Sequence, residues 1–514
     1  MSEAQVIIRG RAGSATGVAQ TVRPQPGDAT ADSQLARFSH SPHRAAAADN
    51  RSVCHCPVRK WRKNLGEGCA GRVVADNGPV MIYYAHLTKI EKVSTMKKLV
   101  LGLSALLPLG AAYSAGFGLY EASARGNALG GALVGSTKDA SAVYYNPANM
   151  TETTNVSVMV GSTFTWLYSD IAVDGRSERN MNPGLFCIPH FFVTTPVWGD
   201  LFFGLGIYCE DGLGTKYGTD WTLAGDTTET TMEQFTLNPN LAYKITDWWS
   251  VAAGLKMSYI TFNNKKRPFY GTPGYNLVSE LDGDDISMGY NFGTSFRLFE
   301  NEDLGRLKLG VVYRSQIKHN IKGDFDINGK IGPYPYHAVP GAYPADRHSD
   351  ASAKLTLPQS LTAGLNWDSP NEKWHAGFAT TWTQWSSVDT IAFKIPARTP
   401  TGAQTSFDLP LEWEDVWRFS LGLEYDVTDD LSLRCGYVFD MDPSSEDRGT
   451  TMLPGGDRHI IGLGVGYYIW RSLRLDVGYN LIMMVSEERE IAGHRFETDN
   501  AYSHMLATTL SYTF

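Results

Sequence analysis

Apolar and polar residues alternate one by one along most of this 514-residue chain after residue 153. In the segment FTLNPNLAYKI (235–245), apolar residues occupy the odd positions, and small or polar residues occupy the even ones. The same period of two runs through 249–259, 286–298, 307–313, 417–425 and 431–439. Because a helix needs spacings of three and four, these segments predict β-strands with one apolar and one polar face.

Fourteen strands are predicted in this way, and the connections between them alternate in length. The predicted strands are 154–168, 184–196, 200–209, 233–245, 249–263, 285–299, 305–319, 351–367, 373–388, 408–427, 431–442, 457–469, 471–485 and 502–514. Short turns fall near 197–199, 246–248, 300–304, 368–372, 428–430 and 470. Long loops fall near 169–183, 210–232, 264–284, 320–350, 389–407, 443–456 and 486–501.

An even number of strands with short turns at one end and long loops at the other is typical of an outer-membrane barrel. A soluble sandwich is the alternative, but it would not sort its loops so regularly. We therefore predict an all-β fold, a fourteen-stranded antiparallel transmembrane β-barrel that occupies residues 154–514.

The two faces of the predicted strands differ in a way that fits a barrel wall. The polar face carries charges that would be costly in lipid, where Arg or Lys at the midplane costs about 2–4 kcal/mol, so this face should line the lumen. These charges are Lys256, Arg297, Lys308, Arg314, Arg418, Glu424, Arg434 and Asp476. The apolar face ends in aromatic residues, as membrane-interface girdles do. They include Trp248, Trp249, Trp374, Trp382, Tyr467 and Tyr468.

Residues 96–114 have the three parts of a signal peptide. Lys97 and Lys98 are its positive start, an eleven-residue apolar run follows over 99–109, and small residues at Ala112 and Ser114 fit a cleavage site. The apolar run is too short to span a bilayer as a helix. We expect an exported protein whose mature chain starts at Ala115.

Residues 1–95 differ from the rest of the chain. They carry a net charge of +6 and show no sustained period of two or 3.6. We interpret them as a non-native or disordered N-terminal extension, with Met96 as the true start. A zinc site in CHCPVRKWRKNLGEGC (54–69) is the alternative, but this stretch lacks the C-x-x-C spacing of such sites.

Composition narrows the functional classes. The whole chain carries a formal charge of −9, and because the extension and the two signal lysines are positive, the mature chain carries −17. So acidic a protein is a poor partner for nucleic acid. Three mature cysteines (Cys187, Cys209 and Cys435) do not suggest a disulfide framework, and no mature apolar run approaches 18 residues.

Catalytic and metal chemistry is not indicated. The mature histidines are scattered, no G-x-S-x-G motif occurs, and Asp282, Asp284 and Asp285 lack the rest of a calcium loop. We expect neither an enzyme nor a cofactor or metal. The chain ends in LATTLSYTF, whose alternation up to Phe514 resembles the terminal strand that the outer-membrane assembly machinery recognises.

Several motifs resemble the FadL/TodX family of outer-membrane transporters for long-chain fatty acids and other hydrophobic molecules. They are GFGLYE and RGNALGGA near the mature start, DASAVYYNPANM (139–150), LNPNLAYKITDWWSVAAGL (237–255), LPQSLTAGL (357–365), WTQWSS (382–387) and LRCGYVFDMDP (433–443). The resemblance covers residues 115–514. It implies uptake of a long-chain fatty acid or similar hydrophobic ligand through an outer membrane of lipid and lipopolysaccharide. A general diffusion porin is the alternative function.

The family resemblance assigns residues 115–153, the hatch segment, to a plug inside the barrel. A barrel of fourteen strands is too wide for its wall side chains to fill. The resemblance implies that Gly116 and Phe117 form the N-terminus of this plug. It also implies that Asn146, Pro147 and Ala148 form a rigid corner where the plug meets the wall, although a turn that merely ends the plug would look the same.

The family also has a kink in the third strand through which ligand leaves sideways into the bilayer. Gly204, Gly206, Asp211 and Gly212 are the matching candidates here, although ordinary lumen residues and a loop start would also explain them.

A fatty acid would need a cation for its carboxylate. The candidates are Lys265, Lys266 and Arg267, with Arg314 and Arg418 as second choices. A solvated loop or a lipopolysaccharide contact is the alternative reading of the first three.

Overall fold

The computed structural model describes residues 71–75, 78–82, 116–178, 181, 184–335, 348–395, 405–445 and 449–514. The predicted signal peptide at 96–114 and most of the extension at 1–95 lie outside the described residues. The chain divides into two units, Met1–Lys98 and Leu99–Phe514. The described part of the first unit is an antiparallel hairpin of β1 (Gly71–Ala75) and β2 (Gly78–Ile82).

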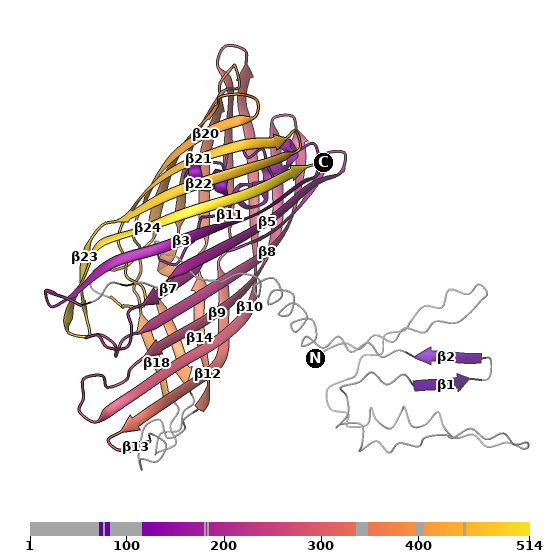
Figure 1. The fold of residues 1–514 in the computed structure, drawn as a ribbon. Helices are drawn as coiled ribbons and strands as arrows, with labels where there is room; N and C mark the ends of the chain where they lie inside the picture. Colours follow the sequence, from indigo (N-terminus) through magenta and orange to yellow (C-terminus); the bar gives the residue numbers. More distant parts are fainter. Residues whose placement is uncertain are drawn as a thin grey trace, which may run out of the picture. The chain divides into compact units, whose positions relative to one another are not determined.

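The second unit is a closed antiparallel β-barrel of fourteen strands, as predicted (Figure 1). Its first six strands are β3 (Ser157–Val173), β5 (Leu185–Trp198), β6 (Leu201–Tyr208) continued by β7 (Gly212–Lys216), β8 (Glu229–Thr246), β9 (Trp249–Lys266) and β10 (Tyr275–Asn301). Each of the next four barrel strands consists of two consecutive elements. They are β11 (Gly305–Arg314) and β12 (Ile317–Ile331), β14 (His348–Leu357) and β15 (Ser360–Asp368), β16 (Trp374–Thr383) and β17 (Thr390–Ile395), and β18 (Thr405–Pro410) and β19 (Val416–Asp426).

The last four strands are β20 (Leu431–Asp440), β21 (Arg458–Trp470), β22 (Leu473–Met484), which β23 (Glu487–Ile491) follows, and β24 (His494–Thr513). Two short elements, β4 (Arg176–Ser177) and β13 (Tyr334–Pro335), lie in outer connections. Pairing of β24 with β3, from Thr513↔Ser157 to Phe496↔Val173, closes the ring. The six predicted short turns are all present, and each joins neighbouring strands at the same end of the barrel.

The strands extend further outward than the sequence pattern predicts. Segment 264–284 was expected to be a loop, but β10 runs from Tyr275 and pairs with both β9 and β12 over this stretch. Here the inward positions Leu277 and Leu281 are apolar and buried, whereas the outward positions Glu280 and Asp282 are charged. Beyond the membrane, polar side chains therefore point outward and apolar ones point inward, because the outer face of the wall meets water there and the inner face does not.

Below this extension the faces agree with the prediction. Large apolar side chains on the outside are exposed to the surroundings, whereas Lys256, Lys308, Arg434 and Asp476 on the inside are buried. No helix of the described residues is long and apolar enough to cross a membrane.

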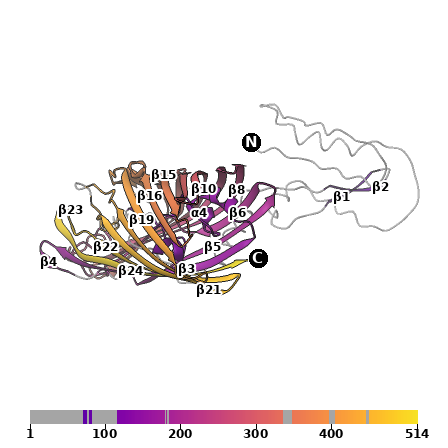
Figure 2. The same cartoon turned by 90° about the horizontal axis from the view of Figure 1, so that it is seen from above.

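The described residues of the hatch segment, 116–153, contain three short helical turns. These are α3 (Ala124–Ala128), α4 (Ala142–Tyr145) and the 3-10 helix η3 (Pro147–Glu152). Ser123 caps α3 by accepting a hydrogen bond from the backbone N–H of Gly126 at 3.0 Å. The turn α3 contacts β20, β21, β22 and β24, and η3 contacts β6, β8, β9 and β10 on another part of the ring. Figure 2 shows α4 among the strands of the barrel.

Glycines of the wall make room for the hatch segment. At Gly310, an added Cβ would lie 1.9 Å from the carbonyl oxygen of Val134, and at Gly377 it would lie 2.2 Å from that of Ala132. An added Cβ would also come too close to hatch atoms at further positions around the ring, which are Gly293, Gly364, Gly422, Gly436, Gly462, Gly464 and Gly478. These nine wall glycines therefore have a packing reason, since a side chain at any of them would meet hatch atoms.

Ion pairs also join the hatch segment to the wall, one of them largely buried and one with an exposed lysine. Arg125 of α3 meets Glu424 of β19 at 3.0 Å and Asp139 of the hatch at 3.1 Å, and Lys138 meets Asp368 of β15 at 3.4 Å. Arg125 and Glu424 are largely buried, and removing one partner of such a pair typically costs about 3–5 kcal/mol, because the other charge is left uncompensated. These contacts hold the base of the hatch segment against β15 and β19.

Candidate functional site

Between the hatch segment and the end of the barrel with the long loops, the inner face of the wall is apolar. We call this part of the interior the outer lumen. The strand extensions β9, β10, β12, β14 and β17 alternate so that every second side chain faces inward. The buried side chains of this region form one cluster with the start of the hatch segment. They include Ile260, Phe262, Leu281, Ile317, Ile321, Leu355, Leu357, Ile391, Phe393, Leu411, Val416, Met452 and Leu453.

Four neighbouring strands of the wall are interrupted at one level. Register partners across β11, β15, β16 and β19 are Arg314, Ser360, Thr383 and Val416, and each is the first or last residue of its strand. Between β16 and β17 the interruption is a 3-10 turn, η5 (Trp385–Val388), whose Trp385 side chain is buried. Side chains at this level can therefore turn into the lumen.

Gly116 and Phe117, the predicted N-terminus of the hatch, lie against Trp385. The Phe117 ring is 1% exposed, and its centroid lies 4.8 Å from that of Trp385 and 5.5 Å from that of Trp413. Gly116 has a φ of +62°, and a Cβ there would come within 2.8 Å of the Trp385 ring. A glycine is thus needed at 116, and the aromatic trio anchors the first described residues of the hatch segment in the outer lumen.

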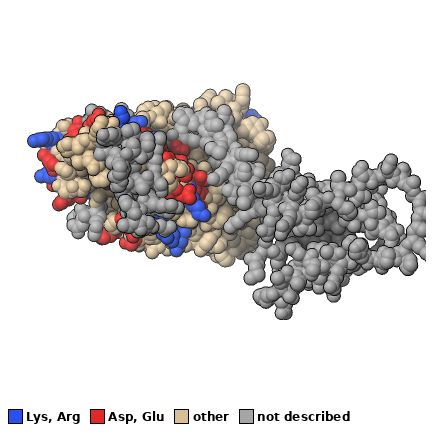
Figure 3. Space-filling view, turned by 90° about the horizontal axis from the view of Figure 1, so that it is seen from below, with Lys and Arg blue, Asp and Glu red and all other residues tan. Residues whose placement is uncertain are grey.

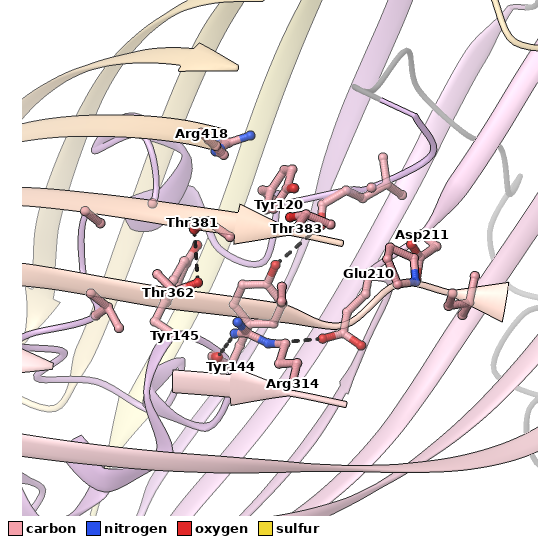
Figure 4. Close-up of a pocket in the computed structure, with 18 of the residues that line it drawn as sticks. Tyr120, Tyr144, Tyr145, Glu210, Asp211, Arg314, Thr362, Thr381, Thr383 and Arg418 are labelled. Carbon is pink, nitrogen blue, oxygen red and sulfur yellow. Dashed lines mark hydrogen bonds and ion pairs between the residues drawn. The ribbon is translucent and has the colours of Figure 1, made fainter. Parts of the chain in front are cut away.

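A cavity of about 90 Å³ lies between the hatch segment and the interrupted strands (Figure 4). It is lined by Tyr120, Tyr144 and Tyr145 from the hatch, by threonines and serines of β15 and β16, and by the cations Lys256, Arg314 and Arg418. Apolar contributions come from Leu119, Ile317, Leu357 and Trp385. Apolar walls with a few converging polar groups are typical of a small-molecule site.

Arg314 and Arg418 reach this cavity from opposite sides of the hatch tyrosines. The Arg418 guanidinium lies 3.9 Å from the Tyr120 ring centroid and donates to Asp440 at 3.2 Å. The Arg314 guanidinium lies 5.0 Å from the Tyr144 ring centroid and donates to the Tyr144 carbonyl oxygen. The fold thus brings both second-choice cations of the sequence prediction to one cavity.

Glu210 lies between two of the cavity cations. Its carboxylate is 2.5 Å from the Lys256 ammonium and 3.3 Å from Nε of Arg314, and it accepts a further hydrogen bond from Thr236 at 3.3 Å. All three ionic side chains are at most 16% exposed. Lys256 and Arg314, which a ligand carboxylate would need as partners, are therefore already paired with a carboxylate of the protein.

The third strand is broken beside this site, at residues 209–211. Pairing of β5 with β6 ends at Phe191↔Ile207, and beyond the break β8 is the one ladder partner of β7 among the strands that the structure describes. The upper part of β5, Leu185–His190, has ladder partners only on β3 among the described strands. The backbone ladder between the second and third strands is therefore missing above Ile207.

The hatch segment takes up hydrogen bonds that the break leaves open. Leu119 N–H donates to the Glu210 carbonyl oxygen at 2.6 Å, and Gly212 N–H donates to the Phe117 carbonyl oxygen at 2.8 Å. Gly118 and Asp211 form an antiparallel bridge between these two bonds. The start of the hatch thus pairs as a short strand with the broken segment, which links its position to that of Glu210.

The candidate glycines of the third strand have different positions. Gly212 starts β7 directly after the break, whereas Gly204 and Gly206 lie in the regular part of β6, which pairs with strands on both sides. A Cβ at Gly204 would lie 2.2 Å from Sδ of Met150, and one at Gly206 would lie 3.0 Å from Val143. These two glycines therefore admit the hatch segment and are not the residues at which the strand breaks.

Asn146, Pro147 and Ala148 lie at a contact between hatch and wall. The Asn146 amide donates to the carbonyl oxygens of Val134 at 2.8 Å and Thr294 at 3.0 Å, and its oxygen accepts from Ala148 N–H at 3.1 Å. Pro147 is the first residue of η3, where a missing N–H carries no cost. One side chain thus joins two hatch turns to β10.

The basic run at the outer end of β9 lies elsewhere. Lys265 pairs with Glu280 at 3.2 Å, and Arg267 pairs with Asp220 at 2.5 Å, so both cations have carboxylates of their own. Lys266 lines a separate cavity of about 70 Å³ beside Leu281, Phe393 and other apolar side chains. The fold therefore does not bring Lys265 or Arg267 to the cavity that Arg314 and Arg418 line.

One group of possible metal ligands occurs among the described residues, at His375, Glu424 and Asp426. Both ring nitrogens of His375 already meet carboxylates, of Asp368 at 2.6 Å and of Asp426 at 3.1 Å. Glu424 is paired with Arg125 and Arg434. These ligand atoms are thus engaged in ion pairs of the protein.

Sequence reasoning missed Glu210, Tyr120 and Trp385 as members of the site. Trp385 stood in the motif WTQWSS and Tyr120 in GFGLYE, so the motifs marked both residues without indicating that they face one cavity. For Glu210, an acid directly after an apolar strand was the available signal.

A family model described as "Outer membrane protein transport protein (OMPP1/FadL/TodX)" matches residues 106–514. The long-chain fatty acid transport protein of Escherichia coli strain K12 is 25% identical over 446 residues, which are 78% of this chain and 95% of that protein. The protein of the same name from Salmonella typhi is 24% identical over 435 residues, with the same two coverages.

Solved structures share the fold. A Pseudomonas aeruginosa FadL homologue superimposes with a TM-score of 0.67 at 19% identity and covers 78% of this chain and 100% of its own. The Pseudomonas putida toluene transporter TodX gives a TM-score of 0.61 at 17% identity and covers 76% of this chain and 98% of its own. At these identities the likeness concerns the barrel and not the ligand.

Proposed function

Because the chain belongs to the OMPP1/FadL/TodX family of outer membrane transport proteins, we propose that its ligands are long-chain fatty acids or similar molecules with an apolar tail. The family match confirms the resemblance that the sequence motifs indicated. The chain is an outer-membrane protein that crosses the membrane many times by its strands and transports hydrophobic compounds.

In the proposed route, the ligand is captured among the outer loops and enters the outer lumen. Its apolar tail leaves water and packs among apolar side chains such as Phe262, Leu355 and Phe393, which stabilises it by about 25 cal/mol for each Å² of its apolar surface buried. A carboxylate head then reaches the cavity, where Arg314 and Arg418 offer positive charge. The hatch segment is the plug that separates this cavity from the periplasmic side.

Release takes place sideways, between the second and third strands. The observation that carries this proposal is the missing ladder above Ile207, with the start of the hatch segment paired to the same broken stretch. Movement of residues 116–119 away from Glu210 and Asp211 opens the wall toward the bilayer. A hydrophobic molecule that leaves there enters hydrocarbon directly and avoids a return to water.

The route is tested by stiffening the break. Gly212→Val, a residue with strong strand preference directly after the break, should reduce uptake of a radiolabelled long-chain fatty acid without reducing barrel assembly. Gly225→Val is the matched control, because a Cβ at this outer-loop position comes no nearer than 3.7 Å to the Arg267 carbonyl oxygen. Equal uptake by both variants would contradict exit at residues 209–212.

The ligand class is tested separately. The protein is purified in mild detergent, and lipophilic molecules that accompany it are identified by mass spectrometry. Fatty acids or other molecules with long apolar tails are the expected result. Purification with none of them, together with free ion conduction in planar bilayers, would instead favour a general diffusion porin.

A further inference from the structure

Three polar side chains of the inner wall form a serine–histidine–aspartate triad, and we infer that it hydrolyses esters with a long acyl chain. They are Ser258 of β9, His319 of β12 and Asp285 of β10, so nothing local in the sequence indicates the group. The His319 ring lies between the other two, with Nε2 3.1 Å from the Ser258 hydroxyl and Nδ1 3.0 Å from the Asp285 carboxylate. Both distances lie within the reach that a nucleophile, its general base and the orienting acid need.

The surrounding hydrogen bonds place the proton of His319 on the nitrogen that this chemistry requires. The Asp285 oxygen that meets Nδ1 also accepts from the Ser287 hydroxyl at 2.8 Å and from the Asn320 N–H at 3.2 Å. A carboxylate surrounded by donors is an acceptor, so Nδ1 carries the hydrogen and Nε2 is left to accept. Nε2 can therefore take the proton of the Ser258 hydroxyl as a general base.

A fourth side chain, Gln234, supplies a donor for the oxyanion. Its amide nitrogen donates to the Ser258 hydroxyl oxygen at 2.8 Å. Its amide oxygen accepts from the Glu210 N–H at 2.9 Å, which fixes the orientation of the amide. The Ser258 hydrogen is thus left for His319. When an ester carbonyl approaches Ser258, the same amide N–H lies within reach of the oxygen on which negative charge develops.

The triad faces the route proposed for the ligand. Ser258 lies on the inner face of β9, between Lys256, which lines the cavity, and Ile260 of the outer-lumen cluster. His319 follows two residues after Ile317, which also lines the cavity. Acidic and basic side chains lie on the surface at this end of the barrel (Figure 3), whereas the inner face is apolar. An acyl chain in the outer lumen would thus bring its ester carbonyl to the level of Ser258.

Access to Ser258 depends on the hatch segment, and this step rests on the proposed function. Ser258 is 0% exposed and His319 is 2% exposed, so a substrate reaches them only when lumen side chains move. Two hydrogen bonds connect the start of the hatch segment to Gln234, since Leu119 N–H donates to the Glu210 carbonyl oxygen and Glu210 N–H donates to the Gln234 amide. Movement of the hatch start away from Glu210 therefore also loosens the amide that contacts Ser258.

The reaction is an acyl transfer to Ser258 followed by hydrolysis. The Ser258 oxygen attacks the ester carbonyl carbon as His319 Nε2 takes the hydroxyl proton, and the bond from this carbon to the alcohol oxygen breaks as His319 passes the proton to that oxygen. Water then adds to the acyl carbon and gives a proton to His319, and the Ser258 oxygen leaves with that proton. The products are an alcohol and a fatty acid, whose carboxylate forms two residues along β9 from Lys256.

The test uses the full-length protein in mild detergent and an alkyl fluorophosphonate, whose phosphorus bonds to an activated serine oxygen with loss of fluoride. Mass spectrometry of peptides should find the label on Ser258 of the wild type. The wild type should also hydrolyse p-nitrophenyl laurate, and Ser258→Ala and His319→Ala should do so at least about 100-fold more slowly, since a general base typically contributes this much or more. Ser279→Ala, which changes another buried serine of the wall, is the matched control and should keep the wild-type rate.

Unaltered heat-modified mobility on gels shows that each variant forms its barrel. Absence of the label from Ser258, or labelling and ester cleavage that persist in His319→Ala, would overturn the inference. A wild type that takes up radiolabelled fatty acid but is not labelled would also overturn the triad, and it would leave the proposed function intact. A labelled wild type that takes up no fatty acid would support the triad and contradict transport of that ligand.

Discussion

The position of Glu210 leads to a prediction that separates acidic from neutral ligands. Glu210 contacts both Lys256 and Arg314 inside the cavity, at 2.5 and 3.3 Å. A fatty-acid carboxylate that enters has to share these cations with it. Glu210→Gln keeps the shape of the side chain but removes the competing charge, so the variant should bind a fatty acid more tightly than the wild type.

The expected size follows from these contacts. A hydrogen bond to a charged group contributes about 1.5–3 kcal/mol. In the variant, the ligand carboxylate gains one such bond from a cation that Glu210 engages in the wild type. At about 1.4 kcal/mol per tenfold change, the Kd of a long-chain fatty acid should fall about 10- to 100-fold. The Kd of the methyl ester of the same acid should stay unchanged, because the ester has no charge to place beside Lys256 and Arg314.

Calorimetric titration of detergent-solubilised protein with the acid and with the ester measures both constants. Glu229→Gln is the matched control, since Glu229 pairs with Lys216 at 3.4 Å on the exposed outer end of β8, away from the cavity. Acid and ester that tighten equally would show that the substitution only loosened the hatch segment. An unchanged Kd for the acid would show that its carboxylate does not reach these cations, and either result would refute the reasoning.

Three further predictions concern the hatch segment and the cations. Phe117→Ala removes a buried ring from the tryptophan pair and should weaken hatch docking by about 3–5 kcal/mol, so ion conductance in planar bilayers should rise; wild-type conductance would contradict this anchoring role. A disulfide between Gly118→Cys and Asp211→Cys, in a background without the native cysteines, should block fatty-acid uptake until a reductant restores it, and uptake by the oxidised form would exclude movement at this bridge. Arg314→Gln should raise the fatty-acid Kd by about 10-fold, whereas Lys265→Gln should leave it unchanged, and the reverse order would move the site to the outer loop.

Some parts of the site could be read from the sequence only as separate candidates. Three adjacent cations, Lys265, Lys266 and Arg267, predict a carboxylate site, but Lys265 pairs with Glu280 and Arg267 with Asp220, and no local pattern indicates these partners. Arg314 and Arg418 were correctly assigned to the lumen face from their place in the alternation. Nothing local indicates that their strands are interrupted at one level, which places both beside the same cavity.

The period of two determined the number of strands, the six short turns and the sidedness of the wall within the membrane. These features depend on neighbouring residues, because successive side chains of a strand always point to opposite faces. The tertiary structure alone decided where strands continue beyond the membrane, where the third strand breaks, and which side chains meet the hatch segment. Glu210, Trp385 and the wall glycines have their roles only because ring closure and strand register bring the hatch segment against them. Such contacts join positions about 90 to 350 residues apart, and no local pattern records them.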